Sequence, residues 1–179
     1  TDEEEQGLYC ELLYLEDLIN KEGQNVIKCW EGPNKNKRDF VFENKSVEIK
    51  STTTQIATSV RISNELQLDP SYPNNINLFL KVYVLEKVEE GDSLSQVAKR
   101  IEQLLVDVEL RKNFLQKLLM DKVDLNLYED TYFYSVQQEH LYRVDSNFPS
   151  INKSNIDNRI FKVEYYINLI GLEENEVKE

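Results

Sequence analysis

The first apolar pattern along the chain has the period of a helix. Its members are Leu8, Leu12, Leu15 and Ile19. This spacing places them on one side of a helix at residues 7–20, which Gly23 is expected to end. The same period recurs at residues 93–106, behind an Asp or Ser cap, and at residues 108–122, so two further helices are predicted.

Other apolar runs have the composition of strands. The most continuous is INLFLKVYVLEKV at 76–88, which predicts a central strand covered on both faces. DFVF at 39–42 and SVEIKST at 46–52 are separated by ENK, which predicts an antiparallel hairpin with a short turn. Further strand candidates are NVIKCW at 25–30, TYFYSVQQEHLYRV at 131–144 and NRIFKVEYYINL at 158–169. TTTQIATSVRIS at 52–63 is expected to be a surface loop that leads into a strand or short helix carrying NELQL.

Helices and strands are thus mixed along the chain. This order predicts an α/β or α+β domain with a central mixed β-sheet flanked by helices. The segments 31–37 and 68–75 combine Pro and Asn with other turn residues and are predicted to be loops. The last two strand candidates would extend an antiparallel sheet or form a platform of aromatic residues.

Length, charge and cysteine content narrow the class of protein. The 179 residues suffice for a single domain, and the start at Thr1 suggests a longer parent chain. Cys10 and Cys29 follow no metal-ligand spacing and are expected to be buried free thiols, Cys29 in a strand. The chain has no long apolar run and no basic signal segment, so we expect a cytoplasmic protein without membrane contact.

The net charge bears on nucleic-acid binding. It is −12, whereas a protein that binds phosphates normally presents a basic surface. The basic residues of the first third nevertheless form a local cluster in the sequence. They are Lys28, Lys35, Lys37, Arg38, Lys45, Lys50 and Arg61.

Charged residues in the predicted hairpin are the first sign of a functional site. Glu48 and Lys50 are two residues apart in a strand and therefore share a face, and Asp39 can lie opposite them once the chain has turned back. Carboxylates rarely sit among packing residues without a partner. Mg²⁺ is a natural partner, because it takes one or two carboxylates, a backbone carbonyl such as that of Ile49, waters and phosphate oxygens. The alternative is a Glu48–Lys50 ion pair on a solvent-facing strand.

The text around these residues resembles the PD-(D/E)xK nuclease superfamily. The matching segments are GLYCELLYLEDL, CWEGPNKNKRDFVF, VEIKST and VRISNELQLD. Asp39 corresponds to the first acid, Glu48 to the second and Lys50 to the lysine, while Arg38 replaces the usual proline. Together the segments are similar to a bacterial branch that is associated with restriction and phage-defence gene clusters.

The resemblance implies a restriction-endonuclease-like core at about residues 7–120, with a C-terminal strand extension at about 130–172. It also implies that Glu11 supplies an acid near the metal, although helical spacing alone does not separate Glu11 from Glu16, which we expect to be exposed. Gln67 matches a polar residue that points at the active-site lysine or the substrate phosphate. An ordinary surface glutamine remains the alternative.

The activity that the resemblance implies is Mg²⁺-dependent hydrolysis of DNA, with Mn²⁺ as a substitute metal. Asp39 and Glu48 would hold the metal, with the Ile49 carbonyl and Glu11 as further ligands, and Lys50 and Gln67 would complete the catalytic set. Expected partners are DNA and other defence proteins, such as motor, ATPase or methyltransferase subunits, and a homo-oligomer stays open. The competing hypothesis is a non-catalytic scaffold subunit that keeps the nuclease fold. His140, the only histidine, is expected to be a surface or core residue.

Overall fold

The computed structural model describes residues 1–34, 38–53, 58–72 and 77–178. The chain forms two compact units. We call Thr1–Asp39 with Glu86–Ser135 the helical unit, and Phe40–Leu85 with Val136–Glu179 the sheet unit. The single domain expected from the chain length stays a prediction. The predicted loops at 31–37 and 68–75 and the Thr-rich segment at 52–63 each lie partly outside the described residues.

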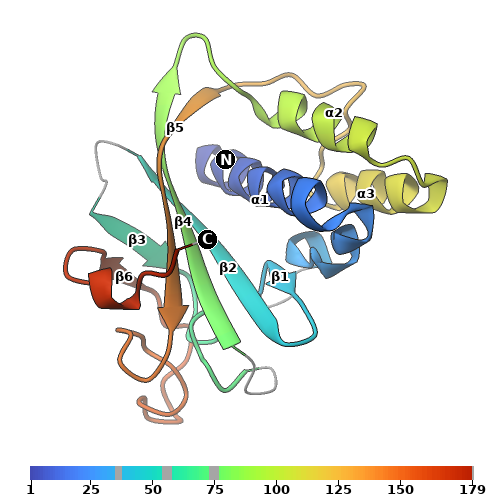
Figure 1. The fold of residues 1–179 in the computed structure, drawn as a ribbon. Helices are drawn as coiled ribbons and strands as arrows, with labels where there is room; N and C mark the ends of the chain where they lie inside the picture. The colour runs from blue at the N-terminus through green and yellow to red at the C-terminus, as the bar shows by residue number, and fades with distance from the viewer. Residues whose placement is uncertain (35–37, 54–57, 73–76, 179) are drawn as a thin grey trace. The chain divides into compact units, whose positions relative to one another are not determined.

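The helical unit contains the three predicted helices (Figure 1). They are α1 (Asp2–Glu22), α2 (Leu94–Leu104) and α3 (Val108–Met120). α1 begins five residues earlier than its apolar stripe indicated, because Thr1 and Glu4 form a capping box and acidic residues fill the first turn. Gly23, with φ 93°, ends α1 as predicted. Ser93 is the residue that caps α2.

The predicted apolar stripe of α1 is buried, and α1 packs against α2. Near this contact, Arg100 forms ion pairs with two acidic residues. Arg100 Nε lies 2.7 Å from Glu16 Oε1, and Arg100 Nη2 lies 2.8 Å from Asp92 Oδ2. The hydrogen bonds that Arg100 donates to Asp92, and then those to Glu16, raise the pKa of Arg100. The expectation that Glu16 is exposed is therefore wrong, because its carboxylate is half-buried against Arg100.

The main sheet has four strands in the order β1-β2-β4-β5 (Figure 1). They are β1 (Phe40–Val41), β2 (Lys45–Thr53), β4 (Asn77–Val88) and β5 (Phe133–Val144). β1 pairs antiparallel with β2, which confirms the predicted hairpin, and β2 pairs parallel with β4. Because β4 lies between β2 and β5, the predicted central strand and mixed sheet are confirmed.

A second sheet joins β3 (Ser59–Ile62) and β6 (Tyr165–Asn168) in antiparallel order. Its apolar residues pack with those of β4 and β5 into one buried cluster. The members are Val60, Ile62, Leu68, Leu78, Leu80, Val82, Tyr142, Val144, Phe148, Ile167 and Leu172. The last predicted strand is therefore shorter than expected, and it pairs with β3 instead of extending the main sheet.

One predicted strand is wrong. Residues 25–29 belong to a 3-10 helix, η1 (Gln24–Cys29), and not to a strand, and Trp30 is the extended residue that caps η1. The chain reverses at Gly23, and the Lys117 ammonium of α3 hydrogen-bonds to the carbonyl oxygens of Ile27 and Trp30 at the end of η1. Both cysteines are free as predicted, but Cys29 belongs to η1 and is only half-buried.

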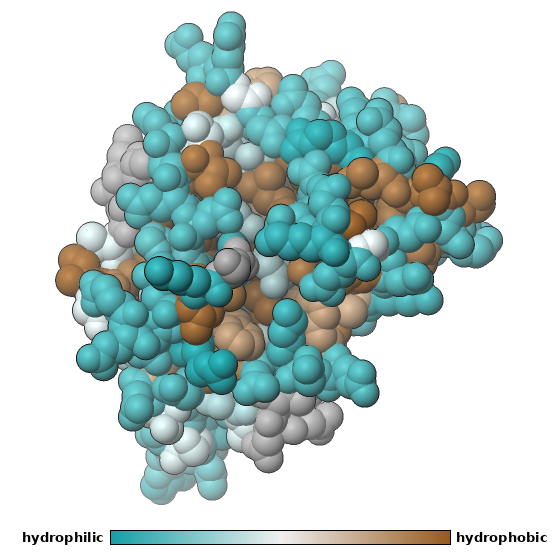
Figure 2. Space-filling view, viewed as in Figure 1, coloured by the Kyte–Doolittle hydropathy of each residue, from teal (hydrophilic) through white to brown (hydrophobic). Residues whose placement is uncertain are grey.

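The visible surface is largely hydrophilic, with hydrophobic side chains gathered over the α2–α3 region (Figure 2). Exposed apolar residues of that region include Val106, Val108, Leu119 and Met120. Over the described part of the chain, no helix is long and apolar enough to cross a membrane.

Tyr134 gives a prediction for stability. Within the residues that the structure describes, its hydroxyl is buried without a hydrogen-bond partner. The ring stacks on that of Tyr9, with 4.7 Å between the centroids. A buried hydroxyl that lacks a partner costs about 1–3 kcal/mol, so Tyr134→Phe should raise the free energy of unfolding by about 1 kcal/mol in urea titrations at neutral pH.

The same variant should respond less to alkali. Burial raises the pKa of Tyr134 above its ordinary value of 10.0, so the unfolded state loses this proton first as pH rises. Ionisation of Tyr134 therefore leaves the free energy of unfolding unchanged below about pH 10 and decreases it above that pH. Tyr134→Phe should lose less stability than the wild type between about pH 9 and about pH 11. Tyr166→Phe, at an exposed position, is the control, and equal effects of both variants would contradict the prediction.

Candidate functional site

Glu48 and Lys50 form an ion pair on β2. Lys50 Nζ lies 3.1 Å from Glu48 Oε1, so the prediction that both side chains share a face is confirmed. Glu48 is 1% exposed, and the Lys50 side chain is 16% exposed. The alternative of a pair on a solvent-facing strand is therefore wrong. Burial weakens solvent screening and strengthens the interaction of both charges with any ligand that reaches them.

On the neighbouring strand β4, apolar residues lie beside this pair. The register places Glu48 beside Leu80 and Lys50 beside Val82, both buried residues of β4. Ser46 lies two residues before Glu48 and therefore on the same face of β2. In the described part of the chain, its buried Oγ has no hydrogen-bond partner, which leaves an oxygen ready for a ligand on this face.

Asp39 directly precedes β1 and belongs to the helical unit. Its carbonyl oxygen accepts hydrogen bonds from the backbone N–H groups of Glu31, at 2.7 Å, and Gly32, at 3.1 Å. These bonds hold the backbone of Asp39 against the loop that follows η1. Arg38, which stands where the superfamily usually has proline, is 1% exposed and so is a buried member of the predicted basic cluster.

Glu11 lies on α1 and its carboxylate is held by Trp30. The indole Nε1 of Trp30 donates to Glu11 Oε2 at 2.8 Å. A Cβ at Gly32 would lie 2.1 Å from the same oxygen, so a side chain at this position would displace the carboxylate. Gly32 therefore contacts Glu11 and also donates to Asp39, which links the surroundings of these two acids within the helical unit.

Trp30 is itself rigidly packed. It is 0% exposed, and its ring centroid lies 5.9 Å from that of Phe114 on α3. Lys117 of the same helix hydrogen-bonds to the Trp30 carbonyl oxygen, and burial lowers the pKa of this lysine. α3 thus fixes Trp30, and Trp30 in turn fixes Glu11.

Gln67 and Ile49 lie in the sheet unit. The side-chain oxygen of Gln67 accepts a hydrogen bond from the backbone N–H of Ser63 at 2.8 Å, which closes the turn that follows β3. Ile49 is the residue of β2 between Glu48 and Lys50, and its register partner is Lys81 of β4. The roles of Gln67 toward the lysine or substrate and of the Ile49 carbonyl toward a metal stay predictions.

The donor set fits a hard cation. Among the described residues, no group of three or more His, Cys, Asp or Glu side chains could hold a metal ion. Mg²⁺ does not require such a group, because it is usually bound by one or two carboxylates with waters and substrate phosphates. The candidate residues offer carboxylate and carbonyl oxygens, and the Ser46 Oγ without a partner adds another oxygen beside Glu48. These are ligands for Mg²⁺ or Mn²⁺ and not for soft metals.

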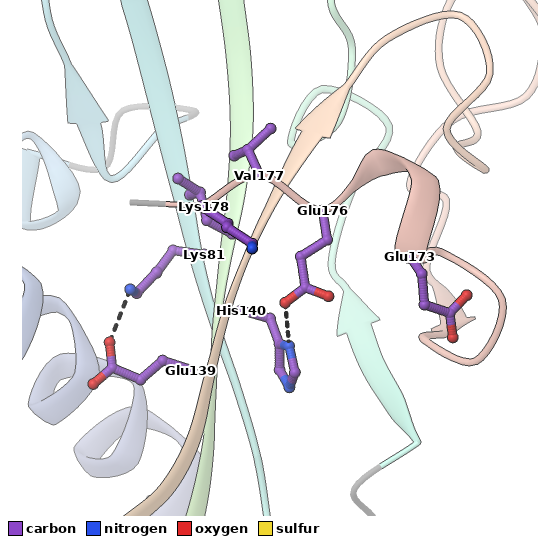
Figure 3. A pocket seen from close by; sticks show the side chains of 8 residues that line it. Lys81, Glu139, His140, Glu173, Glu176, Val177 and Lys178 are labelled. Carbon is purple, nitrogen blue, oxygen red and sulfur yellow. Dashed lines mark hydrogen bonds and ion pairs between the residues drawn. The ribbon is translucent and has the colours of Figure 1, made fainter.

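A separate cavity of about 620 Å³ lies along β5 in the sheet unit (Figure 3). Lys81 Nζ lies 2.9 Å from Glu139 Oε2, and His140 Nδ1 lies 2.6 Å from Glu176 Oε1. The latter contact attaches the C-terminal segment to β5, which agrees with a structural histidine. Lys81 alternates with Leu80, the register partner of Glu48, and so belongs to the opposite face of the sheet.

Sequence reasoning missed Trp30, which contacts a candidate site residue, and Lys81, which is buried on the other face of the sheet. Trp30 is the only tryptophan of the chain, and this rarity was the signal that it had a specific contact. Lys81 is 2% exposed, and a lysine in the middle of an apolar strand was likewise a signal.

A known family matches most of the chain. The family model described as "Putative PD-(D/E)XK family member, (DUF4420)" matches residues 1–170, a range that includes every candidate site residue. No curated protein and no solved structure matched the chain. The mixed α/β fold with its four-stranded mixed sheet is consistent with a restriction-endonuclease-like fold. The chain therefore belongs to the DUF4420 family, and its resemblance to the PD-(D/E)xK superfamily is confirmed.

Proposed function

We propose that this protein is a Mg²⁺-dependent endonuclease that hydrolyses DNA phosphodiester bonds as a cytoplasmic subunit of a bacterial restriction or anti-phage defence system. One observation carries the proposal: a member of a PD-(D/E)XK family buries Glu48 and Lys50 as an ion pair on a strand of its main sheet. A buried ion pair seldom stabilises a fold more than apolar residues would. Chemistry therefore explains the pair better than stability does.

Asp39 and Glu48 would hold the metal, together with the Ile49 carbonyl and Glu11. Chain connectivity supports joint action of the two motif acids. Asp39 is bonded to Phe40, and the register partner of Phe40 is Val47, the neighbour of Glu48. When bound, Mg²⁺ or Mn²⁺ would polarise the scissile phosphate and lower the pKa of a water ligand.

Lys50 would act on the substrate directly. Its ammonium can orient the attacking water or stabilise the negative charge that develops on the phosphate oxygens. The low exposure of Glu48 and Lys50 means that little water competes for these contacts. Gln67 uses its side-chain oxygen on Ser63, so its NH₂ group would be the part that faces a substrate phosphate.

The net charge of −12 supports a role for partners, such as motor, ATPase or methyltransferase subunits, in bringing DNA to the site. It also favours the second candidate, a non-catalytic scaffold subunit with the nuclease fold. Metal binding separates the two candidates, because a scaffold has no need for a metal at Asp39 and Glu48.

The test combines plasmid nicking with calorimetry. The wild type should nick supercoiled DNA with Mg²⁺ or Mn²⁺ and be inactive with a chelator. Asp39→Asn and Glu48→Gln should each reduce nicking by at least about 100-fold and abolish Mn²⁺ binding, because each removes a charged ligand. The control is Asp17→Asn, which changes an exposed acid of α1 that pairs with Lys21.

Two results would count against the endonuclease. Nicking at the wild-type rate by both site variants would reject the roles of Asp39 and Glu48. A wild-type protein that binds no metal, even with DNA and neighbouring gene products present, would favour the scaffold.

A further inference from the structure

Trp30 and Gly32 lie against the Glu11 carboxylate within the helical unit, and Lys117 anchors Trp30. Trp30 donates its indole N–H to Glu11 Oε2 at 2.8 Å. Gly32 presents a backbone without a side chain at the one place where a Cβ would collide with that oxygen. Lys117 binds the carbonyl oxygen of Trp30 and so anchors the residue that holds Glu11.

The chemistry of this arrangement suits orientation of a charged group. An indole N–H can donate but not accept, so it favours the ionised carboxylate oxygen as its partner. Trp30 is 0% exposed, and its backbone is held by a buried lysine that is 7% exposed. The donor is therefore held in a packed position, from which it orients the carboxylate oxygen that accepts its hydrogen bond.

We infer that Trp30 is a positioning residue for Glu11, and that Gly32 contributes by leaving space for the carboxylate. This inference rests on the proposed function, because it assumes that Glu11 is a metal ligand. Trp30 acts through Glu11 and does not touch the substrate. Residues that orient a metal ligand typically affect metal affinity by about 10–100-fold when they are replaced.

Trp30 supplies its own reporter, because it is the only tryptophan in the chain. A ¹⁵N-labelled, metal-free protein will show one indole N–H signal in a two-dimensional NMR spectrum. A hydrogen bond to a carboxylate moves this signal downfield. Glu11→Ala should shift it upfield, whereas Glu16→Ala, which removes another acid of α1 that pairs with Arg100, should leave it in place.

Metal affinity is the second readout. By calorimetry, Trp30→Phe should bind Mn²⁺ about 10–100-fold more weakly than the wild type. The substitution keeps a six-membered aromatic ring and removes the five-membered ring that carries the N–H donor. Gly32→Ala should weaken binding similarly and move the indole signal upfield, since the new methyl group displaces the carboxylate. The control is Tyr9→Phe, which removes a hydroxyl from a residue that is 1% exposed on the same helix.

The outcomes separate this inference from the proposed function. An indole signal that moves in Glu11→Ala, with weaker Mn²⁺ binding by both Trp30→Phe and Gly32→Ala, supports the inference. Unchanged Mn²⁺ affinity in these folded variants overturns it and leaves the proposed function intact. An indole signal that is indifferent to Glu11→Ala also overturns it. A wild type that binds no Mn²⁺ overturns the proposed function and this inference together.

Discussion

Lys50→Met should abolish cleavage and leave metal binding in place. The substitution keeps a long apolar side chain and removes the ammonium that lies 3.1 Å from Glu48. Loss of one preorganised group that stabilises transition-state charge costs about 10²–10³-fold in rate, so single-turnover nicking should fall by that factor. Mn²⁺ affinity should be equal or higher, because a positive charge beside the carboxylate has been removed.

This combination distinguishes a substrate-directed lysine from a metal ligand. The assay is run at a temperature at which the circular dichroism of the variant matches that of the wild type. Lys21→Met is the matched control, because Lys21 also pairs with an acid, Asp17, but on an exposed face of α1. Wild-type nicking by Lys50→Met would remove the lysine from the mechanism, and loss of Mn²⁺ binding would show that it acts through the shape of the site.

The second large effect concerns stability and needs a double-mutant cycle. Lys50→Met alone leaves a carboxylate that is 1% exposed without its lysine, and Glu48→Leu alone leaves the lysine without its acid. Each single variant should lose about 3–5 kcal/mol in free energy of unfolding. The double variant should regain this stability, because two apolar side chains replace a desolvated ion pair. Its free energy of unfolding should lie between the wild-type value and about 4 kcal/mol above it.

Urea titrations of the four proteins give the coupling energy directly. The exposed pair Arg61–Glu164, with side chains 42% and 47% exposed, is the control, and its coupling should not exceed about 1 kcal/mol. Additive losses at Glu48 and Lys50 would contradict the prediction. A double variant that is stable and inactive would show that the pair is kept for chemistry at the expense of stability.

Local periodicity was sufficient for the elements whose partners are close in sequence. The hairpin of β1 and β2 has a short turn, and a period of two places Glu48 and Lys50 on one face wherever the strand lies. The continuous apolar run of β4 required cover on both faces and so predicted a central position. The burial of Glu48 could not be predicted this way, because it depends on strand β4 about thirty residues later.

The failures arose where distant contacts decide the structure. NVIKCW is a short apolar run that suits either a strand or a helix by period. Its state depends on Lys117, which reaches the Trp30 carbonyl from 87 residues away. The length of β6 likewise depends on a distant contact. Its partner β3 lies about one hundred residues earlier and pairs with all four residues of β6, so the rest of the predicted strand has no pairing with β3.

Some candidate site residues could be predicted from the local pattern, whereas others could not. Asp39, Glu48 and Lys50 could be proposed from strand geometry, the family match covers all three, and their roles stay predictions. Glu11 came from resemblance alone, because helical spacing gave Glu16 an equal place. The structure separates these acids through their partners, Trp30 for Glu11 and Arg100 for Glu16.

The buried Glu48–Lys50 pair also has a consequence for descent. If either residue mutates first, the remaining charged side chain loses its ion-pair partner in a largely buried position, whereas the double-mutant cycle is expected to show that the fold tolerates loss of both. Replacement of the pair is therefore expected to pass through a destabilised single variant, so selection on stability alone favours keeping both residues or losing both.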